Sequence, residues 1–239
     1  LHRVWSTDWF RHPEAALKKL VEAVEKARLM AHQKEEEEDE ALVVDTAVLR
    51  EEVAAGPDQL PPYVTAHLPA SVGEKDLHQY PVGKLAQWVE AVVETEGPVH
   101  TEEVARRIAE AAGVSRVGTR MKQHLALATQ FAEGGGRIRR EGEFLWHPGN
   151  RAALRDRSGL PASSRKLRYI APEELDLAIV KVVGEAVAIH PEAAFPYIAR
   201  VLGFTRVTED MRTELLERIG EGVKRGVIRR ENGMLRLPG

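Results

Sequence analysis

The chain contains an internal repeat, in which many positions from about 99 onward carry the same residue as the position ninety places later, in an alignment without a gap. The longest identical run is Ile-Arg-Arg-Glu, which occupies 138–141 and again 228–231. Further identical pairs are His100 and His190, Glu102 and Glu192, Gly113 and Gly203, Met121 and Met211, Leu125 and Leu215, and Gly136 and Gly226. One small structural unit is therefore used twice, and this constrains the fold more than any other feature of the sequence.

Each copy has the pattern of three helices followed by a hairpin. In the first copy, Leu85, Val89 and Val92 have the spacing of an amphipathic helix that stops at Gly97-Pro98. A second helix begins at Thr101 and ends at Gly113, and a third runs from about Ser115 to Phe131. A hairpin turning at Glu141-Gly142 closes the unit. The sequence predicts a mainly α protein with small β wings, arranged as tandem winged-helix domains.

The second copy repeats the pattern, with helices from Pro172, from Pro191 and from about Val207, and a wing turned by Asn232-Gly233. The predicted organisation has five parts: the end of an upstream domain, 1–34; an acidic, proline-containing tether, 35–80; the first winged helix, 81–149; a basic connector, 150–169; and the second winged helix, 170–239.

Charge is divided unevenly along the chain, whose overall net charge is only −3. Residues 1–80 carry a net charge of −7, much of it in the run Glu35–Glu40, whereas residues 81–239 carry +4. The predicted third helix of the first copy contains no acidic residue between Val114 and Ala132. Its counterpart in the second copy contains five, which are Glu209, Asp210, Glu214, Glu217 and Glu221. Because carboxylates repel phosphates, we expect the first copy to be the one that contacts DNA.

The candidate DNA-contacting residues fall into three groups. The third helix of the first copy supplies Arg116, Arg120, Lys122, Gln123 and His124. The first wing supplies Arg137, Arg139 and Arg140, and the connector supplies Arg155, Arg157, Arg165, Lys166 and Arg168. Cations in a loose connector release counterions from DNA without needing fixed geometry, so the connector is expected to add phosphate contacts.

No catalytic set is evident. The chain lacks cysteine, which excludes thiolate zinc sites and cysteine nucleophiles, and its histidines lack a metal-ligand spacing such as HExxH. His100 and His190 precede helices at equivalent places, where capping or packing is the expected role. We therefore expect no enzyme activity, metal or cofactor in this chain. No apolar run is long enough to span a bilayer, and the absence of cysteine fits a cytoplasmic protein.

Several blocks resemble a known family. The block 5–10 (WSTDWF), followed by His12-Pro13-Glu14, resembles the end of the very-short-patch-repair-like nuclease domain of large bacterial superfamily-1 helicases. The block 96–100 (EGPVH), together with 142–146 (GEFLW), 170–175 (IAPEEL) and 201–204 (VLGF), is similar to the C-terminal domain of unknown function that follows that nuclease. The resemblance implies a longer parent with an ATP-dependent helicase core and a metal-dependent nuclease, neither of whose active sites lies in this chain.

The expected function is a non-catalytic DNA-binding module that positions duplex or forked DNA for the upstream helicase and nuclease domains. The acidic third helix of the second copy favours an alternative, a protein-interaction or dimerisation module. A further alternative is autoinhibition, in which Glu35–Glu40 mimics DNA and covers the basic face of the first copy.

Overall fold

The computed structural model describes residues 60–69, 72, 76–114 and 117–238. All of them belong to the unit that spans Asp58–Gly239. The predicted nuclease-like segment 1–34, the acidic run Glu35–Glu40 and the candidate residue Arg116 lie outside the described residues.

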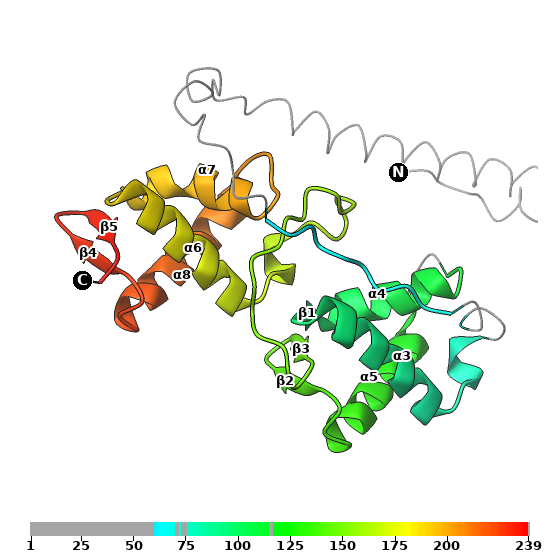
Figure 1. Cartoon of the computed structure of the whole chain (residues 1–239). Coiled ribbons are helices and arrows are strands. Elements are labelled where there is room, and N and C mark those ends of the chain that lie inside the picture. Colours follow the sequence, from blue (N-terminus) through cyan, green and yellow to red (C-terminus); the bar gives the residue numbers. More distant parts are fainter. Residues whose placement is uncertain (1–59, 70–71, 73–75, 115–116, 239) are drawn as a thin grey trace, which may run out of the picture. The chain divides into compact units, whose positions relative to one another are not determined.

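The described part of the chain is mainly α-helical, with small antiparallel β elements (Figure 1). The first copy comprises α3 (Val82–Glu96), β1 (Val99–His100), α4 (Thr101–Ala111), α5 (Thr119–Gly134), β2 (Arg139–Glu141) and β3 (Phe144–Trp146). The second comprises α6 (Pro172–Ala186), α7 (Pro191–Val201), α8 (Glu209–Lys224), β4 (Arg229–Glu231) and β5 (Met234–Arg236). Two short 3-10 helices, η3 (Leu77–Gln79) and η4 (Leu167–Tyr169), precede α3 and α6. Each α-helix and each hairpin strand of the second copy begins and ends ninety residues after its counterpart.

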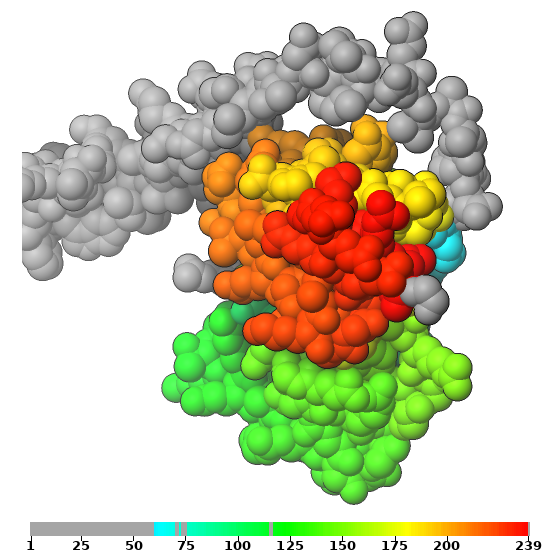
Figure 2. Space-filling model, turned by 90° about the vertical axis from the view of Figure 1, so that its left-hand side faces the viewer, coloured from blue at the N-terminus to red at the C-terminus, as the bar shows by residue number. Residues whose placement is uncertain are grey.

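The β elements follow the same plan in both copies. In the first, β3 lies between β1 and β2, and Val99 pairs with Leu145 while Arg140 pairs with the same residue from the other side. In the second, β4 pairs with β5, and an isolated antiparallel bridge from Ile189 to Leu235 takes the place of β1. Figure 2 shows this β4–β5 hairpin, in red, at the surface of the second copy. Its turn residues Asn232 and Gly233 both have positive φ, as a tight two-residue hairpin loop requires.

Each copy has a hydrophobic core of its own. The cores use the same repeat positions, which are Leu85 and Leu175, Val89 and Ile179, Ile108 and Ile198, Leu125 and Leu215, Ile138 and Ile228, and Leu145 and Leu235. The repeat in the sequence is therefore largely a repeat of buried positions, since packing fixes the size of an interior side chain.

The helix starts differ from prediction at both third helices. Helix α5 begins at Thr119 rather than near Ser115, and α8 begins at Glu209 rather than near Val207. In α8 the side chain of Thr208 accepts a hydrogen bond from the backbone N–H of Met211, which fixes the start of the helix. Apolar periodicity does not resolve such boundaries, because the cap itself is polar or glycine.

Part of the predicted tether packs against the rest of the unit. Val72 and Leu77 are buried in the core of the first copy. Pro62 forms a parallel bridge with Asp156, so that residues 60–69 run alongside the connector at that point. No helix in the part of the chain that the structure describes is long and apolar enough to cross a membrane.

Candidate nucleic-acid interface

Helix α5 buries one side and exposes the other. Leu125, Ala128 and Ala132 face the core of the first copy, where α5 packs on α3. The exposed residues Arg120, Gln123, Leu127 and Phe131 form what we call the α5 face. Lys122 is also exposed, but it lies about 160° around the helix from Arg120. Since the α-helix has 3.6 residues per turn, Arg120, Leu127 and Phe131 align along one stripe of this face.

The beginning of α5 is open to an anion. Gly118 precedes the helix and provides no side-chain cap, and the first turn contains no acidic residue. Arg120 and Lys122 are exposed, and neither makes a hydrogen bond or ion pair within the described residues. The free N–H groups of a helix N-terminus and two cations together favour an oxyanion such as a phosphate.

The beginning of α8 has the opposite character, although it occupies the same place in the repeat. Thr208 caps it, and Glu209 and Asp210 occupy its first turn. Arg212, the counterpart of Lys122, lies with its Nε 3.3 Å from a carboxylate oxygen of Glu209. This helix start is therefore satisfied by its own side chains and repels additional negative charge.

His124 does not join the exposed set. Its side chain is half-buried, and its Nε2 lies 3.1 Å from the backbone carbonyl oxygen of Tyr80. This contact ties α5 to the segment that precedes α3. His124 is therefore a packing residue rather than a surface contact.

The three arginines predicted for the first wing lie at or just before the β2–β3 hairpin and reach the surface, but each is matched by a carboxylate. Arg137 lies 3.1 Å from Glu90, Arg140 donates to Glu133 at 2.7 Å, and Arg139 pairs with Glu141 on the same strand. Each side chain is about two fifths exposed, so this hairpin offers guanidinium groups whose charge is already largely neutralised.

The structure corrects the prediction for two connector residues. Arg155 and Arg157 point into the unit toward a buried carboxylate and do not lie on a loose surface segment. The side chain of Glu174 is fully buried. Its carboxylate oxygens accept hydrogen bonds from Nη1 and Nη2 of Arg157 at 2.6 and 2.7 Å and from Nη2 of Arg155 at 2.8 Å. Burial alone would raise the pKa of Glu174, but the hydrogen bonds and charge of Arg157 and Arg155 outweigh it and lower that pKa. Arg155 also donates to the backbone carbonyl groups of Glu96 and Pro98. These arginines hold the connector in place and are not available to phosphate.

The remaining connector residues divide between bound and open. Arg168 donates to Glu102 at 2.8 Å and to the hydroxyl of Tyr169 at 2.6 Å. Arg165 donates to the backbone carbonyl of Ser158 at 3.1 Å. Lys166 is exposed and makes no hydrogen bond or ion pair with the residues described. Arg120 and Gln123 are open predicted residues on the α5 face, and Lys122 is open on another side of the same helix.

The structure also contains a buried ionic network that the sequence did not indicate. Glu96, with no exposed surface, accepts hydrogen bonds from Arg107 at 3.0 Å, from the Tyr63 hydroxyl at 2.9 Å and from the backbone N–H of Ala66 at 2.9 Å. Burial raises the pKa of the neighbouring Glu103. Nothing in the repeat could reveal this network, because Ala186, the counterpart of Glu96, carries no charge.

His100 caps α4, as expected, but His190 does not cap α7 with its side chain. The Nδ1 of His100 accepts the backbone N–H of Glu102 at 3.1 Å, and its ring packs edge-on against Phe144. Burial lowers the pKa of His100 below its usual value of 6.5. His190 precedes α7 without a side-chain hydrogen bond to it. No cluster of three or more metal-ligating side chains occurs among the described residues.

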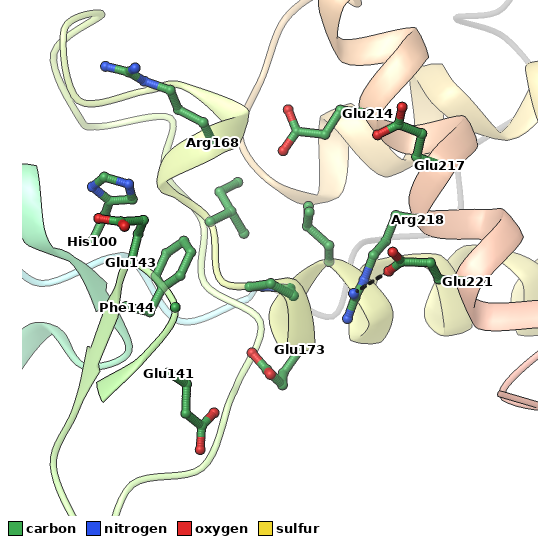
Figure 3. Close-up of a pocket in the computed structure, with 14 residues that line it drawn as sticks. His100, Glu141, Glu143, Phe144, Arg168, Glu173, Glu214, Glu217, Arg218 and Glu221 are labelled. Atoms are coloured by element: carbon green, nitrogen blue, oxygen red, sulfur yellow. Dashed lines mark hydrogen bonds and ion pairs between the residues drawn. The ribbon is translucent and has the colours of Figure 1, made fainter. Parts of the chain in front are cut away.

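A cavity of about 640 Å³ lies elsewhere on the unit and is strongly acidic (Figure 3). Its glutamates come from the β2–β3 hairpin, from α6 and from α8, and they are Glu141, Glu143, Glu173, Glu214, Glu217 and Glu221. Burial, reinforced by the charge of Glu217, raises the pKa of Glu214. The cations that also line it are Arg168 and Arg218, and Arg218 is already paired with Glu221 at 2.9 Å. This cavity disfavours nucleic acid, which leaves the α5 face as the candidate interface.

Comparison with known proteins gives one partial match. The family model described as "Protein of unknown function (DUF3320)" matches residues 75–123, from just before η3 to the first turns of α5. No curated protein and no solved structure matches the chain. The matched segment thus includes the open beginning of α5 and assigns it no function.

Proposed function

We propose that this chain is a non-catalytic, accessory DNA-binding module of the winged-helix type, which contacts DNA phosphates through the first half of α5. The observation that carries the proposal is the contrast between α5 and α8. At matched positions of a duplicated fold, α5 presents Arg120 beside a helix start without a side-chain cap, whereas α8 presents Asp210 beside a start capped by Thr208. Lys122 is unpaired within the described residues, whereas its counterpart Arg212 is paired with Glu209.

Three cations of the first wing support a secondary role in the same contact. Arg137, Arg139 and Arg140 are neutralised by glutamates, so a phosphate near them must compete with an existing ion pair. Exposed ion pairs contribute only about 0–1 kcal/mol, which makes such an exchange inexpensive. The wing would therefore add to the affinity for DNA, while α5 would make the larger contribution.

The expected binding is governed by phosphate rather than by base sequence. Gln123 is the one exposed amide beside the two cations of α5, and a strict base code needs several such groups. In the longer parent that the sequence resemblance implies, such a module would hold duplex or forked DNA near the helicase and nuclease domains.

A salt series tests the proposal. We expect the full chain to bind a fluorescently labelled duplex in an anisotropy titration, with an affinity that falls steeply between about 50 and 200 mM salt. The double variant Arg120→Ala/Lys122→Ala removes two phosphate contacts, so the slope of log K against log salt should become shallower by about 1.8.

Arg212→Ala is the matched control, since Arg212 occupies the position of Lys122 in the second copy and is paired with Glu209. It should leave both affinity and slope unchanged. Absence of binding at the lowest salt, or an equal loss in Arg212→Ala, would contradict the proposal.

A second function is favoured by a specific observation, the acidic cavity lined by α8. Six glutamates against two arginines would suit a basic protein partner better than DNA. A concentration-dependent dimer in sedimentation equilibrium, without any DNA affinity, would support this protein-interaction role instead.

A further inference from the structure

The second half of the α5 face is apolar. Leu127 and Phe131 are 51% and 54% exposed, although both are large hydrophobic side chains. They follow Arg120 by seven and eleven residues, which places all three within about 20° of one line along the helix. A rise of about 1.5 Å per residue sets Phe131 some 16 Å beyond Arg120. The face therefore passes from the cation Arg120 to a hydrophobic platform along one stripe.

Phe131 lies in surroundings that leave part of its ring accessible. The guanidinium of Arg137 lies 5.3 Å from the ring centroid. On the α3 side the nearest backbone position is Gly83, where a Cβ would lie 3.7 Å from the ring, so no side chain covers the ring there. An aromatic ring beside an arginine is the arrangement on which unpaired bases stack in single-strand-binding proteins.

An intact duplex offers these two side chains no base face. Its bases hide their faces in the stack and present polar edges, thymine methyl groups and phosphates to a helix in the groove. An unpaired strand, in contrast, offers free base faces to Phe131 while its phosphates remain within reach of Arg120 on the same stripe of the helix.

We infer that the α5 face receives an unpaired DNA strand where it leaves a duplex, with a phosphate at Arg120 and a base stacked on Phe131 beside Leu127. This inference rests on the proposed DNA-binding function and specifies its substrate as a duplex with a single-stranded tail. The second copy cannot share the role, since Glu217 and Glu221 replace Leu127 and Phe131 at matched positions.

The test compares two DNA probes of equal duplex length, one blunt and one with an unpaired tail of several nucleotides, in anisotropy titrations with the full chain. We expect the wild-type chain to prefer the tailed probe. Phe131→Ala should weaken binding to the tailed probe by about tenfold and leave the blunt probe unchanged, because the loss of one stacked base has roughly this effect.

Two further variants make the result specific. Phe131→Trp should restore the preference, and its additional indole fluorescence should be quenched by the tailed probe alone. Leu216→Ala, which removes a 45% exposed leucine from α8, should leave binding to both probes unchanged.

Each outcome decides a separate statement. Equal effects of Phe131→Ala on both probes, or no effect on either, overturn the stacking inference, while the Arg120→Ala/Lys122→Ala slope still decides the proposed function. Loss of a wild-type self-association in Phe131→Ala, with unchanged binding to the tailed probe, overturns the inference and assigns the apolar half of the α5 face to a protein contact. If the wild-type chain binds neither probe, both the inference and the proposed function are wrong.

Discussion

Helices α5 and α8 have the same length, the same place in the repeat and the same buried leucine, Leu125 in one and Leu215 in the other. Their exposed sides are opposite in character. Where α5 shows Arg120, Leu127 and Phe131, α8 shows Asp210, Glu217 and Glu221.

The difference separates two kinds of constraint within one duplicated fold. A buried position must fit its neighbours in both copies, so Leu145 and Leu235 remain leucine at the hairpin that closes each core. An exposed position is free of that requirement and can be altered for a partner. The divergence of α5 from α8 is therefore where a difference in function is to be sought.

The two copies also differ in where they bury charge, and this gives the largest predicted effect. Glu174 is fully buried on α6, whereas its counterpart Lys84 on α3 is exposed. Glu174→Ala leaves Arg155 and Arg157 without their carboxylate and should lower the free energy of unfolding by about 3–5 kcal/mol. Urea denaturation followed by circular dichroism measures this loss.

Lys84→Ala is the matched control and should stay within about 0.5 kcal/mol of the parent chain. If Glu174→Ala and Lys84→Ala lower the free energy of unfolding equally, the buried ionic contact does not distinguish the two copies.

The histidines at the starts of α4 and α7 give a smaller contrast. His100 caps α4 and packs against Phe144, whereas His190 is exposed and makes no side-chain cap. His100→Ala should lower the free energy of unfolding by about 2 kcal/mol, because the cap and the ring contact are lost. His190→Ala should change it by no more than about 0.5 kcal/mol. Thermal and urea midpoints check both values, and a larger loss at His190 would reverse the comparison.

The smallest predicted effect is in the pH dependence of stability. Burial lowers the pKa of His100, so between that lowered pKa and 6.5 the unfolded chain binds a proton that the folded chain does not. This contribution to stability is therefore complete above pH 6.5 and is lost as the pH falls from 6.5 through the lowered pKa. His100→Asn keeps a capping acceptor without the titrating ring, and it should reduce the loss of stability between about pH 7 and pH 5. His190→Asn should not, and an identical pH profile for His100→Asn and the parent chain would refute the role given to burial.

Much of the fold could be predicted because the relevant information is periodic. Apolar residues at helical spacing located the helices, and the ninety-residue offset carried each assignment to the second copy, where the element boundaries repeat it. The starts of α5 and α8 were misplaced by a few residues. Local caps such as Thr208 and Gly118 decide those positions, and they add nothing to an apolar pattern.

The candidate site was predicted less completely. Counting charges along the chain selected Arg120, Lys122 and Gln123, which are exposed, but it also included Arg155 and Arg157, which are held by the buried carboxylate of Glu174. The exposed pair Leu127 and Phe131 was not singled out, although its spacing from Arg120 is visible in the sequence. Charge composition alone does not distinguish a solvated arginine from one held by a buried carboxylate.

The duplicated plan of helices and hairpins follows from the sequence alone, because hydrophobic spacing is a property of neighbours along the chain. Which charges are free depends instead on tertiary packing. Glu174 meets Arg157 across 17 residues, and Glu96 meets Tyr63 across 33. Such pairings depend on how distant segments pack together, and no local pattern along the chain encodes them.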